Sequence, residues 1–456
     1  MEVKELPEGW VEVSLDRVAQ WGSGGTPSRK KLEYYNGNIP WIKTGDLGEK
    51  YIKHSSEFIT EDAIKNSSAK MFSKGSVALA MYGATIGKTS ILDIDATTNQ
   101  ACAVGKPNKA ISSEFLYYLL RNEKDNFIAK AKGGAQPNIS QTVIKNHNIF
   151  LPSIHEQNKI VSLINRNIAQ VEQIQNSLNA IPKILEKFRQ SVLADAVSGK
   201  LTEGWRGDSL TNNSNWQLIR LNDIAHWGSG GTPSRKIIEY YNGDIPWVKT
   251  GDLGKKYLNK TSENITVLGL KNSSAKIYPK GVVAIAMYGA TIGKVSILNI
   301  QAATNQACAV AKAKQGITNS EYIYYFLLSQ KDEFIRKGKG GAQPNISQTL
   351  IKEHPINLPP LPEQTEIVRR VEELFAFADQ IEERVAQAQS RVNHLTQSIL
   401  NQAFTGKLTE QWRADNPELI TGDNSAVALL ASIESERKTT KTRKSKTAKN
   451  KTNKKA

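Results

Sequence analysis

The sequence contains the same long stretch twice. Residues 21–30 recur unchanged at 227–236. When Ala19–Val104 is aligned with Ala225–Val310, 24 of the 86 positions differ, which leaves 62 identities. The repeat length of about 207 residues is far above the 20–50 residues of solenoid units. The chain is therefore predicted to hold two copies of one domain-sized module.

Each copy has two parts of different character. The first part, about 150 residues long, has short β-branched segments separated by Gly, Pro and Asn, and a helical segment such as 113–121. Short strands with turn residues and a few helices are typical of an α+β globule. The second part of each copy has the periodicity of one long helix.

Apolar residues on these long helices recur at alternating spacings of four and three, which is the seam pattern of a coiled coil. The alternative is that each helix packs on its own globule, but such a helix usually has a broader apolar face. Asn167 is a polar residue in the seam and can fix the register. The residues expected to pair the helices are Ile160, Ile164, Asn167, Val171, Ile174, Leu178 and Leu185 in the first copy and Ile367, Val371, Leu374, Ile381, Val385, Val392 and Ile399 in the second.

The predicted fold is α+β, with two homologous globular domains joined by two long antiparallel coiled-coil helices and related by a pseudo-twofold axis. A helix of ~45 residues spans ~65 Å. The expected boundaries are 1–153 and 201–360 for the globules, 154–200 and 361–409 for the helices, and 410–456 for a C-terminal extension.

The net charge of +16 is unevenly distributed. Residues 437–456 contain ten Lys or Arg and no acid, so +6 remains for residues 1–436. We expect this tail to be disordered; it either keeps the protein soluble or holds polyanions loosely. No apolar run is long enough to span a membrane, and the N-terminus lacks a signal-peptide core. Cys102 and Cys308 each lie in an apolar run and are expected to be buried, so we expect a cytoplasmic protein without a metal site.

Two similar globules on a rigid spacer suit a ligand with its own twofold symmetry, and duplex DNA is such a ligand. The motifs support this interpretation. Gly-Gly-Thr-Pro-Ser, Lys-Thr-Gly-Asp-Leu, Tyr-Gly-Ala-Thr-Ile-Gly-Lys and Thr-Asn-Gln-Ala-Cys each occur twice, and Leu-Pro-Pro-Leu-Pro-Glu-Gln precedes the second helix. Over residues ~7–413 the chain resembles the specificity subunits of type I restriction-modification systems.

The resemblance implies two target-recognition domains that read a bipartite site in double-stranded DNA. It also implies helices that dock two modification subunits, which methylate adenine N6 with S-adenosylmethionine, and restriction subunits that use ATP and Mg²⁺ in phage defence. The specificity subunit itself binds no cofactor and catalyses nothing.

Three glycine-containing loops in each copy combine cations with groups that can contact phosphates or base edges. The alternative is that the same residues support the fold. The DNA-binding candidates are Ser23, Thr26, Arg29, Lys30, Lys43, Tyr82, Thr85, Lys88, Lys132, Gln136 and Asn138, with their counterparts Ser229, Thr232, Arg235, Lys236, Lys249, Tyr288, Thr291, Lys294, Lys339, Gln343 and Asn345. Residues 52–64 differ most from their counterparts and are expected to form a tolerant surface loop.

Enzymatic motifs are missing from the sequence. The string from Gly83 to Thr89 has three residues between its glycines where a phosphate loop needs four, so a strand-turn-strand corner is the better interpretation. Two alternatives stay open: a stand-alone pseudo-dimeric DNA-binding regulator, and an enzyme with a hidden site. Because the two globules are nearly the same sequence, we predict an interrupted palindrome as the recognised site.

Overall fold

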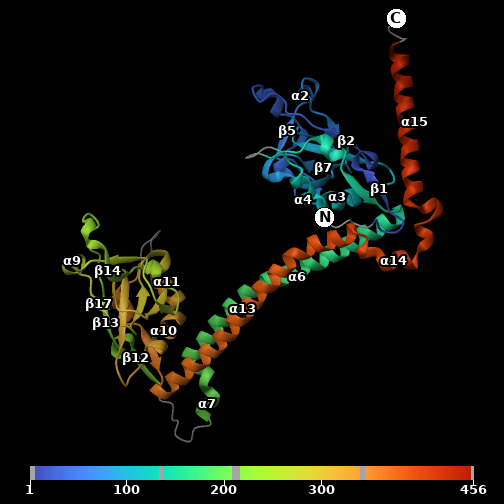
Figure 1. The fold of residues 1–456 in the computed structure, drawn as a ribbon. Coiled ribbons are helices and arrows are strands. Elements are labelled where there is room, and N and C mark those ends of the chain that lie inside the picture. Colours follow the sequence, from blue (N-terminus) through green and yellow to red (C-terminus); the bar gives the residue numbers. More distant parts are fainter. Residues whose placement is uncertain (1–5, 133–136, 208–215, 339–344, 453–456) are drawn as a thin grey trace. The chain divides into compact units, whose positions relative to one another are not determined.

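The structure is a computed structural model that describes residues 6–132, 137–207, 216–338 and 345–452, with side chains up to Thr439. The chain divides into two compact units (Figure 1). Unit 1 contains residues 1–177 and 389–456, and unit 2 contains residues 178–388. Each unit thus holds one globule and part of both long helices. Among the described helices, none has the length and apolarity needed to cross a membrane.

The described residues of unit 1 form three β-sheets. A five-stranded sheet has the order β2-β10-β7-β8-β4, a four-stranded sheet has the order β5-β3-β9-β6, and β1 pairs with β11. The β3–β9 and β4–β8 pairs are parallel and the other pairs are antiparallel. The strands are β1 Val11–Ser14, β2 Ala19–Ser23, β3 Ile39–Ile42, β4 Tyr51–Ile52, β5 Glu57–Ile59, β6 Met71–Phe72, β7 Val77–Ala80, β8 Thr89–Leu92, β9 Ala96–Thr98, β10 Cys102–Pro107 and β11 Asn148–Leu151. The helices of this globule are α1 Leu15–Val18, α2 Glu61–Lys65, α3 Ser113–Asn122, α4 Lys124–Ala129 and α5 Gln141–Lys145.

The five-stranded sheet is buried on both faces. Val77 and Leu79 of β7 join the cluster that contains the aromatic residues of α3, whereas Ala78 and Ala80 point to the other cluster with Cys102. This alternation follows from the two-residue period of a strand. Helix α3 begins where the Ser112 side chain accepts a hydrogen bond from the backbone N–H of Phe115. Cys102 is fully buried, which confirms the expectation for this cysteine, and burial raises the pKa of its thiol to about 12.

The globule of unit 2 repeats the same topology. Its sheets have the orders β13-β21-β18-β19-β15, β16-β14-β20-β17 and β12-β22. Strands and helices together confirm the predicted α+β class. The strands are β12 Gln217–Arg220, β13 Ala225–Ser229, β14 Tyr241–Val248, β15 Tyr257–Leu258, β16 Glu263–Ile265, β17 Ile277–Tyr278, β18 Val283–Ala286, β19 Val295–Leu298, β20 Ala302–Thr304, β21 Cys308–Ala313 and β22 Pro355–Leu358. The helices of unit 2 besides the long ones are α7 Glu203–Gly207, α8 Leu221–Ile224, α9 Val267–Lys271, α10 Ser320–Ser329, α11 Lys331–Lys337 and α12 Gln348–Lys352.

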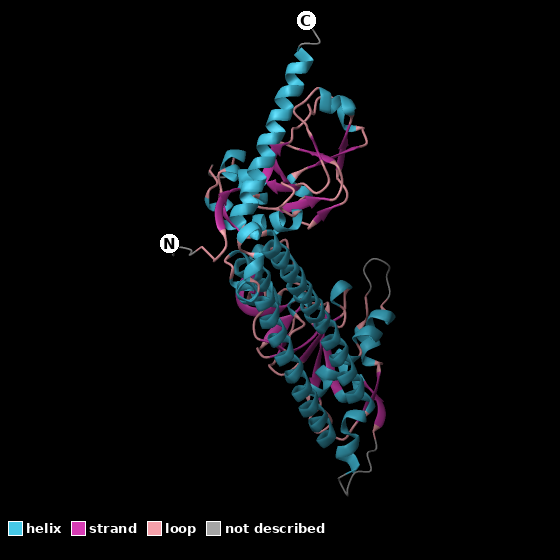
Figure 2. Cartoon of the chain, turned by 90° about the vertical axis from the view of Figure 1, so that its right-hand side faces the viewer, coloured by secondary structure: helices cyan, strands magenta, loops and turns pink. Residues whose placement is uncertain are grey.

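The two long helices are α6 (Ile154–Ser198) and α13 (Leu361–Phe404), and they lie side by side (Figure 2). In unit 1 the Gln175 amide donates to Asn393 Oδ1 at 2.8 Å. In unit 2 Arg189 contacts Asp379 at 2.5 Å and Glu382 at 2.9 Å. Within unit 1 the early part of α6 packs near the end of α13, and within unit 2 the late part packs near its start. The helices are therefore antiparallel, which confirms the predicted fold.

The predicted seam is largely buried, with one exception. Ile174 is 46% exposed, so its assignment to the seam was wrong. The neighbouring stretch of α13 includes Asn393 and His394, which are exposed polar residues, and Asn393 accepts the hydrogen bond from Gln175. The buried members are Ile160, Ile164, Val171, Leu185, Ile367, Val371, Val385 and Val392, and the half-buried ones are Asn167, Leu178, Leu374, Ile381 and Ile399.

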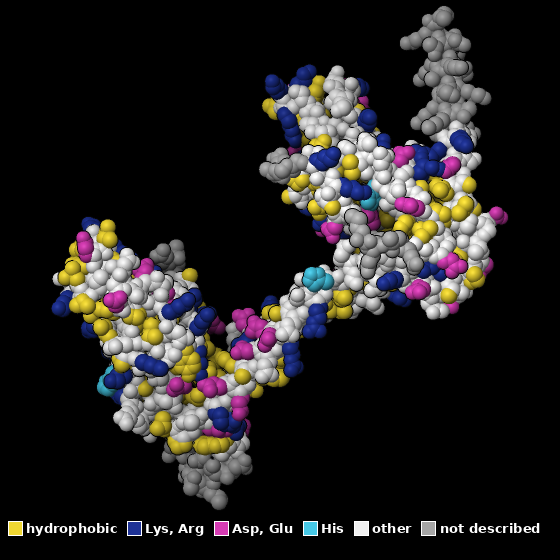
Figure 3. All heavy atoms as spheres, viewed as in Figure 1, with side chains coloured by type: hydrophobic (Ala, Val, Ile, Leu, Met, Phe, Trp, Pro, Cys, Tyr) yellow, Lys and Arg dark blue, Asp and Glu magenta, His cyan; other side chains and the backbone are white. Residues whose placement is uncertain are grey.

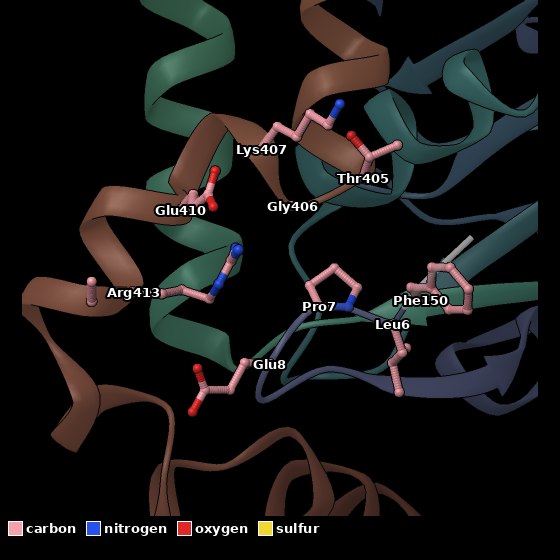
Figure 4. Close-up of a pocket in the computed structure, with 10 residues that line it drawn as sticks. Leu6, Pro7, Glu8, Phe150, Thr405, Gly406, Lys407, Glu410 and Arg413 are labelled. Carbon is pink, nitrogen blue, oxygen red and sulfur yellow. The ribbon is translucent and has the colours of Figure 1, made fainter. Parts of the chain in front are cut away.

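A buried glutamate sits near the start of each long helix. Glu156 accepts hydrogen bonds from Trp10 Nε1 at 2.9 Å, Thr409 Oγ1 at 2.7 Å and Arg413 at 2.7 Å. Figure 4 shows Arg413 beside α6, at the edge of a cavity of about 670 Å³ lined by Pro7, Phe150, Lys407 and neighbours. We call Glu156 and its three donors, Trp10, Thr409 and Arg413, the glutamate junction of unit 1.

Unit 2 builds the same junction from other segments. Glu363 accepts from Trp216 Nε1 at 3.0 Å, Thr202 Oγ1 at 2.7 Å and Arg206 at 2.5 Å. A buried carboxylate is tolerated only when it is paired and hydrogen-bonded, and here three donors satisfy it. The two junctions fasten the segment that follows one long helix to the start of the other.

The C-terminal extension packs on the globule of unit 1. It contains α14 (Glu410–Asp415) and α15 (Ala426–Thr452), and Figure 1 shows α15 beside the globule. Ile433 is buried, Arg437 pairs with Asp16 at 3.2 Å and Glu434 pairs with Arg17. The helix through Thr452 differs from the disordered tail expected after residue 436. Residues 426–452 lack Gly and Pro, and apolar side chains near the start of α15 anchor it, which favours a helix.

Candidate nucleic-acid interface

The predicted loops leave the five-stranded sheet at one end. Ser23 at the end of β2 pairs with Ala103, Ala80 at the end of β7 pairs with Cys102, and Thr89 at the start of β8 pairs with Leu79. The loops that follow β2, join β7 to β8 and precede β10 therefore meet at the same edge. We call residues 23–30, 81–88, 98–101 and 137–138 the sheet-end face of unit 1. Its counterpart in unit 2 has the same register, with Ser229 opposite Ala309 and Ala286 opposite Cys308.

The first loop is held close to the strands by two glycines. The backbone N–H of Gly25 donates to Thr98 O at 2.9 Å, and Trp41 Nε1 donates to Gly25 O at 3.0 Å. A Cβ atom on Gly24 would lie 1.8 Å from Thr98 O, so a side chain there would collide with the backbone. Thr26 Oγ1 also donates to the side chain of Gln100. Gln100, which sequence reasoning missed as a site residue, therefore belongs to this face.

The second and third loops are joined by backbone hydrogen bonds. Gly83 N–H donates to Pro137 O at 2.8 Å, and Ile139 N–H donates to Met81 O at 2.9 Å. In unit 2 Ile346 N–H donates to Met287 O at 2.9 Å in the same way. Gln136, Lys339 and Gln343, which were DNA-binding candidates, lie outside the described residues.

The loop from Gly83 to Lys88 is a corner between two strands. It follows β7, makes one short turn at Gly83–Thr85 and enters β8. Gly83 and Gly87 have φ angles of 61° and 81°, in the left-handed region that glycine adopts without strain. A phosphate loop leads from a strand into a helix, so the strand-turn-strand interpretation is the one that fits.

A charged cluster fixes two of the candidate cations. Glu57 lies 2.7 Å from Arg29 and 2.6 Å from Lys43. The Arg29 guanidinium lies over the ring of Tyr35 at 4.2 Å and near Trp41 at 5.0 Å. The hydrogen bonds from Arg29 and Lys43 hold the pKa of Glu57 below its usual value. The two cations and the one carboxylate leave a net charge of +1. Glu57 therefore orients Arg29 and Lys43 without cancelling their positive charge.

Unit 2 contains the same cluster, with distances of 2.8 Å from Arg235 to Glu263 and 2.7 Å from Lys249 to Glu263. The sequence pattern did not identify Glu57 or Glu263. Residues 52–64 were expected to be a tolerant surface loop, and that expectation was wrong. They form β4, β5 and α2, with Ile52, Ile59 and Ala63 buried in the core.

The other candidates fall into two groups by exposure. Most lie at the surface, where a ligand can reach them, whereas others lie half-buried between neighbouring segments. Figure 3 shows Lys and Arg side chains spread over the visible face of both globules among apolar and acidic ones. The exposed candidates are Thr26, Arg29, Lys30, Tyr82, Lys88, Lys132, Asn138, Thr232, Arg235, Lys236, Tyr288 and Asn345, and the half-buried ones are Ser23, Lys43, Thr85, Ser229, Lys249, Thr291 and Lys294. Within the described residues, no group of three or more His, Cys, Asp or Glu is arranged to hold a metal ion.

Comparison with known proteins agrees with this arrangement. A family model described as the type I restriction modification DNA specificity domain matches residues 7–183 and 213–388. The chain is 31% identical over 457 residues to the type I restriction enzyme EcoKI specificity subunit of Escherichia coli K12, which covers 96% of this chain and 97% of that one. It is 34% identical over 348 residues to the EcoDI specificity subunit of Escherichia coli, covering 72% and 77%.

Solved structures show the same fold. The crystal structure of the HsdS subunit from Thermoanaerobacter tengcongensis has a TM-score of 0.60 at 20% identity and covers 88% of this chain and 98% of that one. A chain from a study of complex assembly in the type I R-M system has a TM-score of 0.63, also at 20% identity, and covers 88% and 99%. These relatives give no support to a stand-alone regulator.

Proposed function

This chain belongs to the type I restriction-modification DNA specificity family and is a specificity subunit of such a system, and we propose that its two sheet-end faces read the two halves of a bipartite DNA site. One observation carries the proposal: the same face, built from loops at one end of a sheet, occurs once in each unit. Exposed Arg, Lys, Tyr and Asn side chains on it suit contacts with phosphates and base edges.

The recognised half-sites should share their core bases. Residues 23–30 and 82–88 are identical to 229–236 and 288–294, so the two faces offer the same groups. If the globules are related by the twofold axis that the repeat predicts, the faces read the same sequence on opposite strands. The site is then an interrupted palindrome.

We further propose that α6 and α13 dock two modification subunits and that this chain supplies no catalytic group and binds no cofactor. S-adenosylmethionine, ATP and Mg²⁺ then belong to the modification and restriction subunits. The exposed polar faces of both long helices are the support for docking, because a paired coiled coil leaves such faces open to partners.

The experiment is strand-resolved mapping of methylated adenines in cells that carry the gene, with and without its modification subunit. We expect paired methylation at two half-sites that are inverted repeats of each other, and none from the purified chain alone. Asn138→Ala and Asn345→Ala are a matched pair, and each should weaken DNA binding by about tenfold. Methylation or cleavage by the isolated chain, or unrelated half-sites, would contradict the proposal.

A further inference from the structure

A pocket lies at the rim of the sheet-end face in unit 2. Its volume is about 310 Å³, and it is lined by Arg235, Ile238, Tyr241, Asn242, Glu263 and Asn264. Arg235 belongs to the first loop of the face, and Trp247 connects the pocket wall to that loop by donating to Gly231 O at 3.1 Å. We call this the Arg235 pocket.

The arginine in this pocket is oriented before any ligand arrives. It lies 2.8 Å from Glu263, with its guanidinium 4.4 Å from the ring centroid of Tyr241 and 5.2 Å from that of Trp247. Its side chain is still 54% exposed. A guanidinium held on one side by a carboxylate and a ring can present its remaining donors to a ligand with little loss of side-chain entropy.

Asn264 adds a second hydrogen-bonding group. Its Oδ1 accepts from Thr261 Oγ1 at 3.1 Å, and within the described part of the chain its Nδ2 makes no hydrogen bond. An amide oxygen can accept two hydrogen bonds. Asn264 therefore keeps both Nδ2–H donors and one acceptor position on Oδ1, which include the donor and the acceptor that an asparagine uses on the N6 and N7 edge of adenine.

Unit 1 differs at this place although its sheet-end face is otherwise the same. The counterpart of Asn264 is Phe58, which is 41% exposed. The backbone differs too, because Asn242 has a φ of 59° whereas its counterpart Asn36 has a φ of −107°. Asparagine enters the left-handed region more readily than most residues, and here the backbone takes a different local path in the two copies. Position 58 presents an aromatic ring where position 264 presents an amide.

We propose that positions 58 and 264 each contact one base pair of their half-site and make the two half-sites differ there. Phe58 packs on the methyl group of a thymine, and Asn264, supported by Arg235, binds the edge of an adenine. The remaining bases, read by the identical residues of the two faces, form an inverted repeat. This inference rests on the proposed function and specifies it further: the recognised site is a palindrome broken at one position.

The test is methylation mapping of full-length variants in complex with the modification subunit. When each half-site is read 5′ to 3′ on the strand that its own globule contacts, the two wild-type half-sites should be identical except at one position, with thymine in the first and adenine in the second. Asn264→Phe should convert the second half to thymine and restore a full palindrome. Phe58→Asn should convert the first half to adenine, with each variant changing the base preference at that position by about tenfold.

Met71→Ile is the matched control, because it also gives unit 1 a residue of unit 2 at an exposed position but lies outside the pocket. It should leave the motif unchanged. A wild-type palindrome with no broken position, or asymmetry that neither exchange alters, overturns the inference. The proposed function fails separately, if no bipartite methylation depends on this chain. If the Asn264→Phe variant does not assemble with the modification subunit, the methylation motif of the Phe58→Asn variant decides the test.

Discussion

The two units share their junctions but differ in how the globule is attached to the helices. Glu156 and Glu363 have the same three kinds of donor, Trp, Thr and Arg. The difference lies at Lys50 and its counterpart Lys256. Lys50 pairs with Glu114 of its own globule at 2.6 Å, whereas Lys256 pairs with Glu372 on the long helix α13. Asn165 of α6, the counterpart of Glu372, accepts a hydrogen bond from Lys50 at 2.8 Å.

This difference shows which charged side chains can change their partner between the two copies. A fully buried carboxylate must keep every donor, because an unpaired charge in the interior is costly. A half-exposed lysine needs only one nearby carboxylate, and either the globule or the helix can supply it. Copies of one module can thus diverge at half-exposed contacts while their buried junctions stay the same.

The largest effect should come from the junctions. Glu156→Gln and Glu363→Gln each remove the charge that balances Arg413 or Arg206, and each should lower the free energy of unfolding by about 3 kcal/mol. Urea unfolding monitored by tryptophan fluorescence measures it. Glu410→Gln and Glu203→Gln, at exposed positions of α14 and α7, are the controls and should change little. If the substitution left the free energy of unfolding nearly unchanged at one junction only, the two junctions would not be equivalent.

A slightly smaller effect is expected in the helix seam. Ile160 and Ile367 are counterparts and both are buried, so Ile160→Ala and Ile367→Ala should each cost about 2–3 kcal/mol. Ile174→Ala, at the exposed position, should stay within about 0.5 kcal/mol. Thermal unfolding of the three variants tests this. A large loss at Ile174 would mean that the seam continues through it.

The smallest effect concerns the charged clusters of the two faces. The pKa of Glu57 and of Glu263 is lowered by their cations, so each cluster stabilises the fold above the ordinary pKa of a glutamate and loses that contribution as the pH falls through the lowered value. The double variant Glu57→Gln, Glu263→Gln should be less stable than the wild type by about 1 kcal/mol at pH 7, and the difference should disappear at an acid pH where both glutamates are protonated. Urea unfolding of both proteins at pH 7 and at acid pH measures this difference in stability. A difference that does not depend on pH would show that it does not come from the charged clusters.

Much of the fold follows from local sequence patterns, whereas the site depends on long-range contacts. The repeat predicted two like globules, and the heptads predicted that the two long helices pair. The pattern of one helix did not show which residues lie opposite it, because these come from a segment more than 200 residues away, as the hydrogen bond from Gln175 to Asn393 shows. Glu57 escaped notice for the same reason, since its two cations lie in other loops. Loops with glycine and cations were recognisable, but their convergence at one sheet edge required the strand register.

The glutamate junctions have a consequence for the order in which the protein can be completed during synthesis. Unit 2 is one continuous stretch, residues 178–388, and Glu363 finds all its donors within it. Unit 1 needs residues 389–456, and Glu156 has neither Thr409 nor Arg413 until these have left the ribosome. The module that is made first is therefore the one that finishes folding last, and a chain stopped before residue 409 would carry a buried glutamate without its charge partner.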